Sequence, residues 1–97
     1  MNMLISNANL IVNTDIETNE GDELEFAVVF NIDDERMFYL NSTSYEILKI
    51  AEKPISVQEI IDYFNDMYVL TIEDIDSINR VILDMIEKNI LLQVIKE

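Results

Sequence analysis

Residues 38–48 read FYLNSTSYEIL, and the change of pattern inside this stretch decides the fold. Up to Leu40 the residues are aromatic and apolar, and they continue a β-prone run that begins at Arg36. After Asn41 the apolar residues recur at helical spacing. The sequence therefore predicts a strand over Arg36–Leu40 that leads almost directly into a helix.

The chain before this stretch carries signals for further β-structure. Glu23–Asn31 reads ELEFAVVFN, and its alternating pattern predicts a strand. The acidic residues of Asp33–Glu35 favour a turn, so this strand and Arg36–Leu40 should form a hairpin. A shorter strand is expected near Leu10–Val12, and the polar stretch Thr14–Asp22 is interpreted as a turn or loop.

Three helices are expected after the strand at Arg36–Leu40. Thr43–Glu46 and Ser56–Glu59 each have the pattern of a capping box, and Thr71 is a suitable N-cap for the third helix. Pro54 separates the first two helices, because the residue before a proline disfavours helical geometry. The apolar positions at helical spacing are Ile47, Leu48, Ala51, Ile60, Ile61, Phe64, Ile75, Ile78, Ile82, Met85 and Ile86.

The end of the chain completes the prediction of the fold. Asn89 can adopt the left-handed conformation that ends a helix, and the apolar residues 90–95 form either a final strand or an extended arm. We expect an α+β fold, winged helix-turn-helix-like, with an N-terminal three-stranded antiparallel sheet followed by three α-helices. A single domain should span residues 1–97.

Composition limits the classes of function. The chain has no Cys and no His, which removes the usual zinc and iron–sulfur ligands, the commonest general base and the thiol nucleophile. Twenty acidic residues against six basic ones give a net charge of −14, which repels nucleic acid and either attracts basic partners or maintains solubility. We expect a non-catalytic protein without a cofactor or metal, located in the cytoplasm and not in a membrane.

The stretch FYLNSTSYEIL resembles the strand-to-helix signature of PqqD-like proteins, in which a strand ends in Leu-Asn and a helix with Glu-Ile-Leu follows. Ile55–Ile61 resembles the start of the second helix of that family, and Glu87–Leu92 resembles the end of the third. The chain departs from the family pattern at Glu52–Pro54, where Asp-Gly is frequent, and at Asn89, where Gly is usual. The resemblance covers more than half of the chain.

This resemblance implies a function. PqqD-like domains act as recognition elements for ribosomally synthesised and post-translationally modified peptides (RiPPs). They bind the leader of a precursor peptide as an added β-strand and present it to a modifying enzyme such as a radical enzyme, a cyclase or a protease. The leader pairs with the third strand, beside a groove bounded by the third helix. The residues that we expect to bind the peptide are Arg36, Met37, Phe38, Tyr39, Leu40, Asp76, Asn79, Arg80, Ile82, Leu83 and Ile86.

Each of these residues also has an ordinary structural interpretation. Alternation predicts that Phe38 and Leu40 face the core, and the apolar residues of the third helix could serve core packing alone. Leu83 lies off the main apolar stripe and therefore needs another partner. The charged side chains could meet charges of a leader or form a solvated face. An uncovered strand edge could also pair with a second copy of the chain to form a homodimer.

Three other functions are considered. An acidic adaptor or inhibitor that binds a basic protein would have the same composition. Asp76–Ile78 resembles the Asp-Ser-Leu site of acyl or peptidyl carrier proteins, but there the serine opens a helix, whereas here it is expected inside one. The winged-helix outline would permit DNA binding, but residues 72–88 carry five acidic residues against Arg80 and Lys88.

Overall fold

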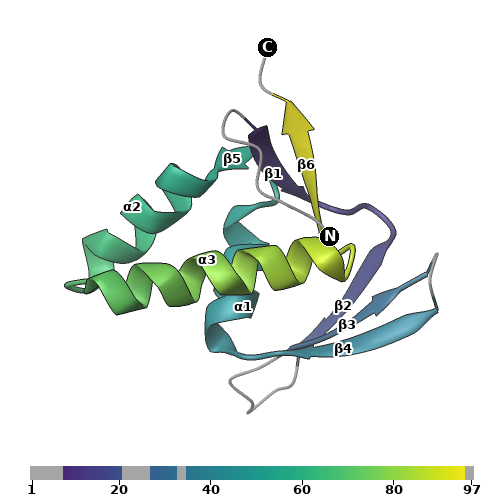
Figure 1. The fold of residues 1–97 in the computed structure, drawn as a ribbon. Helices are drawn as coiled ribbons and strands as arrows, with labels where there is room; N and C mark the ends of the chain where they lie inside the picture. Colours follow the sequence, from purple (N-terminus) through teal and green to yellow (C-terminus); the bar gives the residue numbers. More distant parts are fainter. Residues whose placement is uncertain (1–7, 21–26, 33–34, 96–97) are drawn as a thin grey trace.

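The structure is a computed structural model, in which residues 8–20, 27–32 and 35–95 are described. Nine elements follow one another along the chain (Figure 1). They are β1 (Ala8–Val12), β2 (Ile16–Glu20), β3 (Ala27–Asn31), β4 (Arg36–Leu40), α1 (Ser42–Ile50), β5 (Ile55–Ser56), α2 (Val57–Met67), α3 (Ile72–Glu87) and β6 (Leu91–Ile95).

The first sheet has the strand order β2-β3-β4, and both of its pairings are antiparallel. The predicted hairpin is confirmed, with Asn31 opposite Arg36 at its closed end. The loop predicted over Thr14–Asp22 is wrong in its centre, because residues 16–20 form β2 and pair with β3. The first four residues of the strand predicted over Glu23–Asn31 lie outside the described residues.

The second sheet has the order β5-β1-β6 and joins segments that are far apart in the sequence. Residues 91–95 form a strand paired antiparallel with β1, so the apolar tail closes as a strand. The strand predicted near Leu10–Val12 exists, but it belongs to this second sheet and not to the N-terminal three-stranded sheet. Its register fixes this placement, since Leu10 lies opposite both Ile55 and Gln93.

The helices begin at side-chain caps. Asn41 caps α1 with its Oδ1, which accepts a hydrogen bond from the backbone N–H of Ser44 at 2.9 Å. The capping box predicted at Thr43–Glu46 is therefore wrong by two residues: the strand ends at Leu40, and Asn41 is already in the extended geometry of a cap. The capping box at Ser56 is confirmed, and Thr71 caps α3 together with Asp74.

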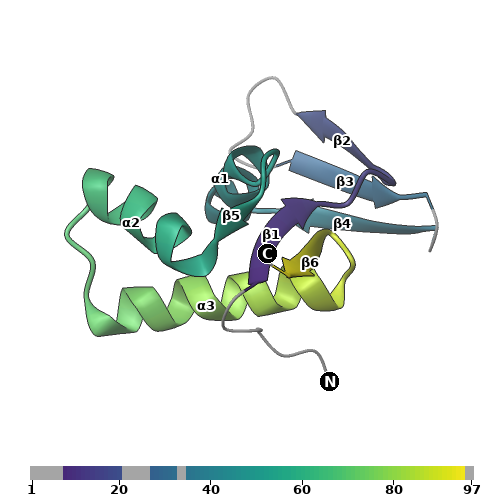
Figure 2. The ribbon, with the colours of Figure 1, turned by 90° about the horizontal axis from the view of Figure 1, so that it is seen from above.

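The core lies between the helices and the two sheets. Most of the predicted apolar stripe is buried, and Ile75 and Ile61 are only partly buried. The buried hydrophobic core consists of Leu10, Val29, Leu40, Ile47, Leu48, Ala51, Ile60, Phe64, Ile78, Ile82, Met85, Ile86, Ile90 and Leu91. In Figure 2, β4 is the strand of the first sheet nearest to α3, and β2 is the farthest. The fold thus sets the outer strand β4 beside the longest helix.

Candidate functional site

Strand β4 presents an unpaired edge. It is the last strand in the order β2-β3-β4, and its one strand neighbour in the described part of the chain is β3. The predicted alternation is confirmed: Leu40 is buried and Phe38 is partly buried, whereas Met37 is 59% exposed and Tyr39 is 72% exposed. The main-chain groups along the outer edge of β4 are therefore in a position to pair with another extended segment.

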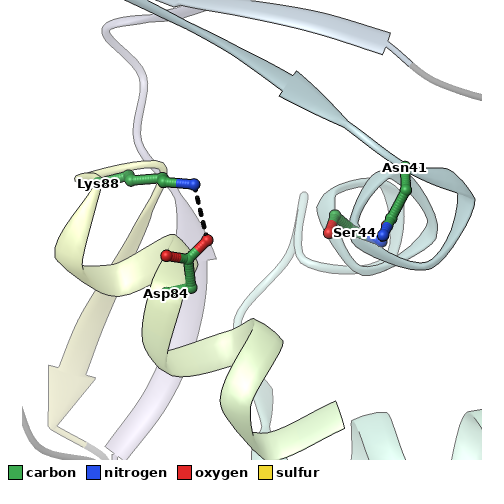
Figure 3. Close-up of polar contacts among 4 residues, drawn as sticks. All are labelled: Asn41, Ser44, Asp84 and Lys88. Atoms are coloured by element: carbon green, nitrogen blue, oxygen red, sulfur yellow. Dashed lines mark hydrogen bonds and ion pairs between the residues drawn. The ribbon is translucent and has the colours of Figure 1, made fainter. Parts of the chain in front are cut away.

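A groove lies beside the end of this strand, between β4, the start of α1 and α3. We call it the β4–α3 groove, and it is lined by Tyr39, Leu40, Asn41, Ser44, Arg80, Val81 and Asp84. Figure 3 shows residues from its two sides, with Asn41 and Ser44 at the start of α1 and Asp84 on α3 beside the C-cap residue Lys88. The groove thus runs from a strand edge onto the surface of a helix.

Three basic side chains lie along β4 and α3, and one of them, Arg80, lines the groove. The guanidinium of Arg36 and the ammonium of Lys88 each lie 5.2 Å from the centre of the Phe38 ring. Lys88 also forms an ion pair of 2.8 Å with Asp84 one turn earlier on α3, and Arg80 lines the groove. Half of the six basic residues of a chain with net charge −14 are therefore placed around one strand and one helix face.

A second pocket adjoins the groove, and we call it the α2–α3 pocket. Asn41 and Val81 line both cavities, so the two are adjacent. The other residues of its lining come from α1, from α2, from the segment before α3 and from α3 itself. They are Ser42, Thr43, Glu46, Phe64, Met67, Tyr68, Val69, Leu70, Asp74, Ser77 and Ile78.

One carboxylate in the α2–α3 pocket is part of a hydrogen bond within the protein. Glu46 accepts a hydrogen bond from the hydroxyl of Tyr63 on α2. This hydrogen bond, together with desolvation and the negative charge of Glu46, raises the pKa of Tyr63 above its usual value of 10.0.

The structure brings only some of the predicted site residues together. Arg36–Leu40 form the exposed edge, and Arg80 lies in the groove beside Tyr39 and Leu40. Ile82 is fully buried and Ile86 nearly so, because both belong to the core stripe of α3, and they present little surface to a ligand. They line neither cavity, and their predicted role in peptide binding stays a prediction.

The remaining predicted residues of α3, which are Asp76, Asn79 and Leu83, line neither cavity. Each residue of an α-helix is turned by about 100° from the one before, so Leu83 lies about 160° around the helix from Val81. The groove uses the flank of Val81 and Asp84, while these three residues lie on the opposite flank. Their predicted role in peptide binding stays a prediction.

Sequence reasoning missed Val81, Asn41 and Ser44 as groove residues. The sequence does hold a signal for Val81, because it is an apolar residue at the border of the core stripe of α3. Asn41 and Ser44 are polar residues at the start of a helix, and their pattern indicates a cap and not a binding surface. Only the packing of α3 beside β4 brings these residues to one groove.

Three other kinds of site were considered for the described part of the chain: a metal site, a carrier-protein serine and a membrane-spanning helix. No group of three or more Asp or Glu residues there could hold a metal ion. Ser77 lies in the second turn of α3 and not at a helix start, which differs from the site of carrier proteins. None of the helices among these residues combines the length and the apolar character needed to span a bilayer.

Comparison with known proteins identifies the fold. No protein-family model and no curated protein sequence matches the chain. The structure is similar to that of TbiB1, solved in complex with the TbiA(beta) leader peptide, with a TM-score of 0.70 and 15% sequence identity. The similarity covers 84% of this chain and 93% of the TbiB1 chain, and at this identity it shows a shared fold. The predicted winged-helix-like α+β fold is thereby confirmed.

Proposed function

We propose that this chain binds the leader segment of a ribosomally synthesised precursor peptide as an added strand on the outer edge of β4. The observation that carries the proposal is the unpaired edge of β4 beside the β4–α3 groove. Strand addition draws affinity from main-chain hydrogen bonds and selectivity from pockets for alternate side chains. TbiB1, whose fold this chain shares, has been solved with a leader peptide bound.

The groove supplies what such a peptide needs. Main-chain groups of Arg36–Leu40 would form the ladder, and the exposed side chains of Met37 and Tyr39 would flank it. Val81 offers an apolar contact, while Arg80 offers a positive charge to an acidic residue of the leader. The bound leader would lie along α3, which gives it one fixed register.

The proposed role is recognition and delivery without catalysis. The chain lacks Cys and therefore a thiol nucleophile, and because it also lacks His, acid–base chemistry at neutral pH would need other residues. A separate modifying enzyme in the cytoplasm would act on the core of the precursor while the leader stays on β4. This arrangement raises the local concentration of the precursor at the enzyme.

The test begins with a search of the genes beside that of this chain for a short candidate precursor peptide. Its leader region is titrated against the full chain by calorimetry, and amide hydrogen exchange is measured with and without the peptide. We expect slower exchange at residues 36–40 and unchanged exchange at residues 16–20, because β2 is also an edge strand but lines neither of the two described cavities. Protection of neither strand despite measurable binding would overturn strand addition.

A pair of variants isolates the contribution of the main chain. Tyr39→Pro removes a backbone N–H that Tyr39→Ala keeps, so only the proline variant should lose affinity strongly. Thermal unfolding of both variants establishes that the hairpin is intact. Equal affinity of the two folded variants would argue against a main-chain hydrogen bond from Tyr39 to the peptide. If the proline variant does not fold, the hydrogen-exchange experiment decides the question.

A further inference from the structure

The α2–α3 pocket is a part of the surface that strand addition to β4 alone does not explain. Its volume of about 800 Å³ exceeds the 600 Å³ of the β4–α3 groove. Both values fall within the range of roughly 300–1,000 Å³ that is usual for ligand sites. Because Asn41 and Val81 line both cavities, the second pocket adjoins the groove near the Leu40 end of β4.

The lining of the pocket is suited to an apolar side chain. Phe64 and Ile78 form walls that belong to the buried core. At the rim, Tyr68 is 62% exposed and Val69 is 96% exposed, although both are large apolar residues. Exposed apolar residues gathered at a cavity mark an interaction site, since water contact with this surface is unfavourable.

The α2–α3 pocket is lined by acidic side chains, whereas basic side chains lie at the opposite end of α3. Glu46 and Asp74 line the pocket, and each accepts a hydrogen bond from a neutral donor within the protein. Neither carboxylate forms an ion pair with the described residues, so no basic side chain of this part of the chain is paired with them. Arg36 and Lys88 provide positive charge at the far end of α3.

We propose that the two cavities form one continuous peptide site, and that the α2–α3 pocket takes a large aliphatic or aromatic side chain next to a basic residue. The apolar side chain fills the space between Phe64 and Tyr68, while the basic residue meets Glu46 and Asp74. The inference rests on the proposed function, since pairing with β4 brings the peptide to this pocket. It specifies a ligand class: a strand-forming segment followed on one side by an apolar and a basic residue.

The first experiment selects ligands without knowledge of the leader. A random peptide library displayed on its encoding RNA is selected against the full chain, and the selected peptides are sequenced. We expect enrichment of a large apolar residue adjacent to Lys or Arg, at a fixed distance from a β-prone segment. Peptides that slow amide exchange at residues 36–40 but carry no such pair would overturn the inference.

The second experiment fills the pocket. Ser77 is exposed and lines the pocket, so Ser77→Trp should occupy it without disturbing the core. Glu87→Trp is the matched control, because Glu87 is exposed on the same helix and lines neither cavity. We expect a selected peptide to lose roughly tenfold or more in affinity for Ser77→Trp, as for loss of one buried apolar side chain. Wild-type affinity of Ser77→Trp would overturn the inference.

The third experiment tests the charge. Glu46→Gln keeps an acceptor for the hydroxyl of Tyr63 and removes the negative charge, and Glu52→Gln removes a charge that lines neither cavity. Glu46→Gln should weaken binding about twofold to fivefold, and the loss should vanish for a peptide whose basic residue is replaced by Gln. An equal loss for both peptides would overturn the charge contact. Failure of every selected peptide to protect residues 36–40 would instead overturn the proposed function.

Discussion

The side-chain amide of Asn13 donates a hydrogen bond to the backbone carbonyl of Asn89, 2.9 Å away, and thereby ties the β1–β2 corner to the end of α3. The amide of Asn31 reaches the same carbonyl at 3.5 Å from the end of β3. Asn31 is almost fully buried, whereas Asn13 is partly buried and Asn89 is exposed, so this junction lies at the border of the core. It fixes the first sheet, and therefore β4, relative to α3.

Removal of this tie should destabilise the fold. Asn13→Ala deletes the donor to Asn89 and the acceptor for the backbone N–H of Asp15 at 3.0 Å. We expect a loss of about 1 to 2 kcal/mol in the free energy of unfolding, measured by urea denaturation. Asn65→Ala, at an exposed position of α2, is the control and should change stability by less than about 0.5 kcal/mol.

The backbone at Asn89 gives a second prediction. Its φ of 58° lies in the left-handed region, which Gly and Asn tolerate and β-branched residues do not. Asn89→Val should destabilise the protein by roughly 1 to 2 kcal/mol, whereas Asn89→Gly should be tolerated because the accepting carbonyl remains. Thermal unfolding of the two variants distinguishes them, and equal destabilisation would mean that the side chain matters more than the backbone conformation.

The pH dependence of stability follows from Tyr63. Its pKa is raised in the folded protein, so the folded state holds the phenolic proton more tightly than the unfolded state. The stabilisation from the bond to Glu46 is therefore fully present below about pH 10 and is lost as pH rises through the folded pKa. Urea midpoints should fall more steeply above pH 10 for the wild type than for Tyr63→Phe. Parallel curves for the two proteins would contradict this.

The flank of α3 that meets the peptide can be located without mutation. Val81 lines both cavities, and Leu83 lines neither of them. In a methyl-labelled sample, addition of a peptide that protects β4 should shift the Val81 methyl resonances and leave those of Leu83 nearly unchanged. The reverse pattern would assign the peptide to the Leu83 flank, as the off-stripe position of Leu83 alone predicts.

Local sequence patterns predicted the elements well. Strand β4, its exposed and buried faces, the caps of α2 and α3 and the left-handed residue at Asn89 all follow from neighbouring residues, because their causes are local. Strand β2 was missed because IETNE has few apolar residues, and its pairing with β3 creates the strand. The assignment of β1 to the second sheet depends on distant partners, since β5 lies between α1 and α2 and β6 follows α3.

The candidate site was predictable only on the strand side. Alternation identifies the exposed residues of β4, whereas the periodicity of α3 identifies the buried stripe and leaves two flanks equivalent. The packing of α3 beside β4 determines that the flank of Val81, and not the flank of Leu83, lines the groove. Local sequence patterns do not predict such a tertiary contact. Sequence reasoning chose Asp76, Asn79 and Leu83 from the flank that lines neither cavity.

The pairing of β1 with β6 places Ala8 opposite Ile95, so the two ends of the described chain meet at one point of the second sheet. Figure 1 shows β6 directed away from β2, β3 and β4. A domain with adjacent ends can be inserted into a surface loop of a host protein with little strain on either junction. This domain could therefore be grafted as an insert into an enzyme, with the β4–α3 groove left open to a peptide.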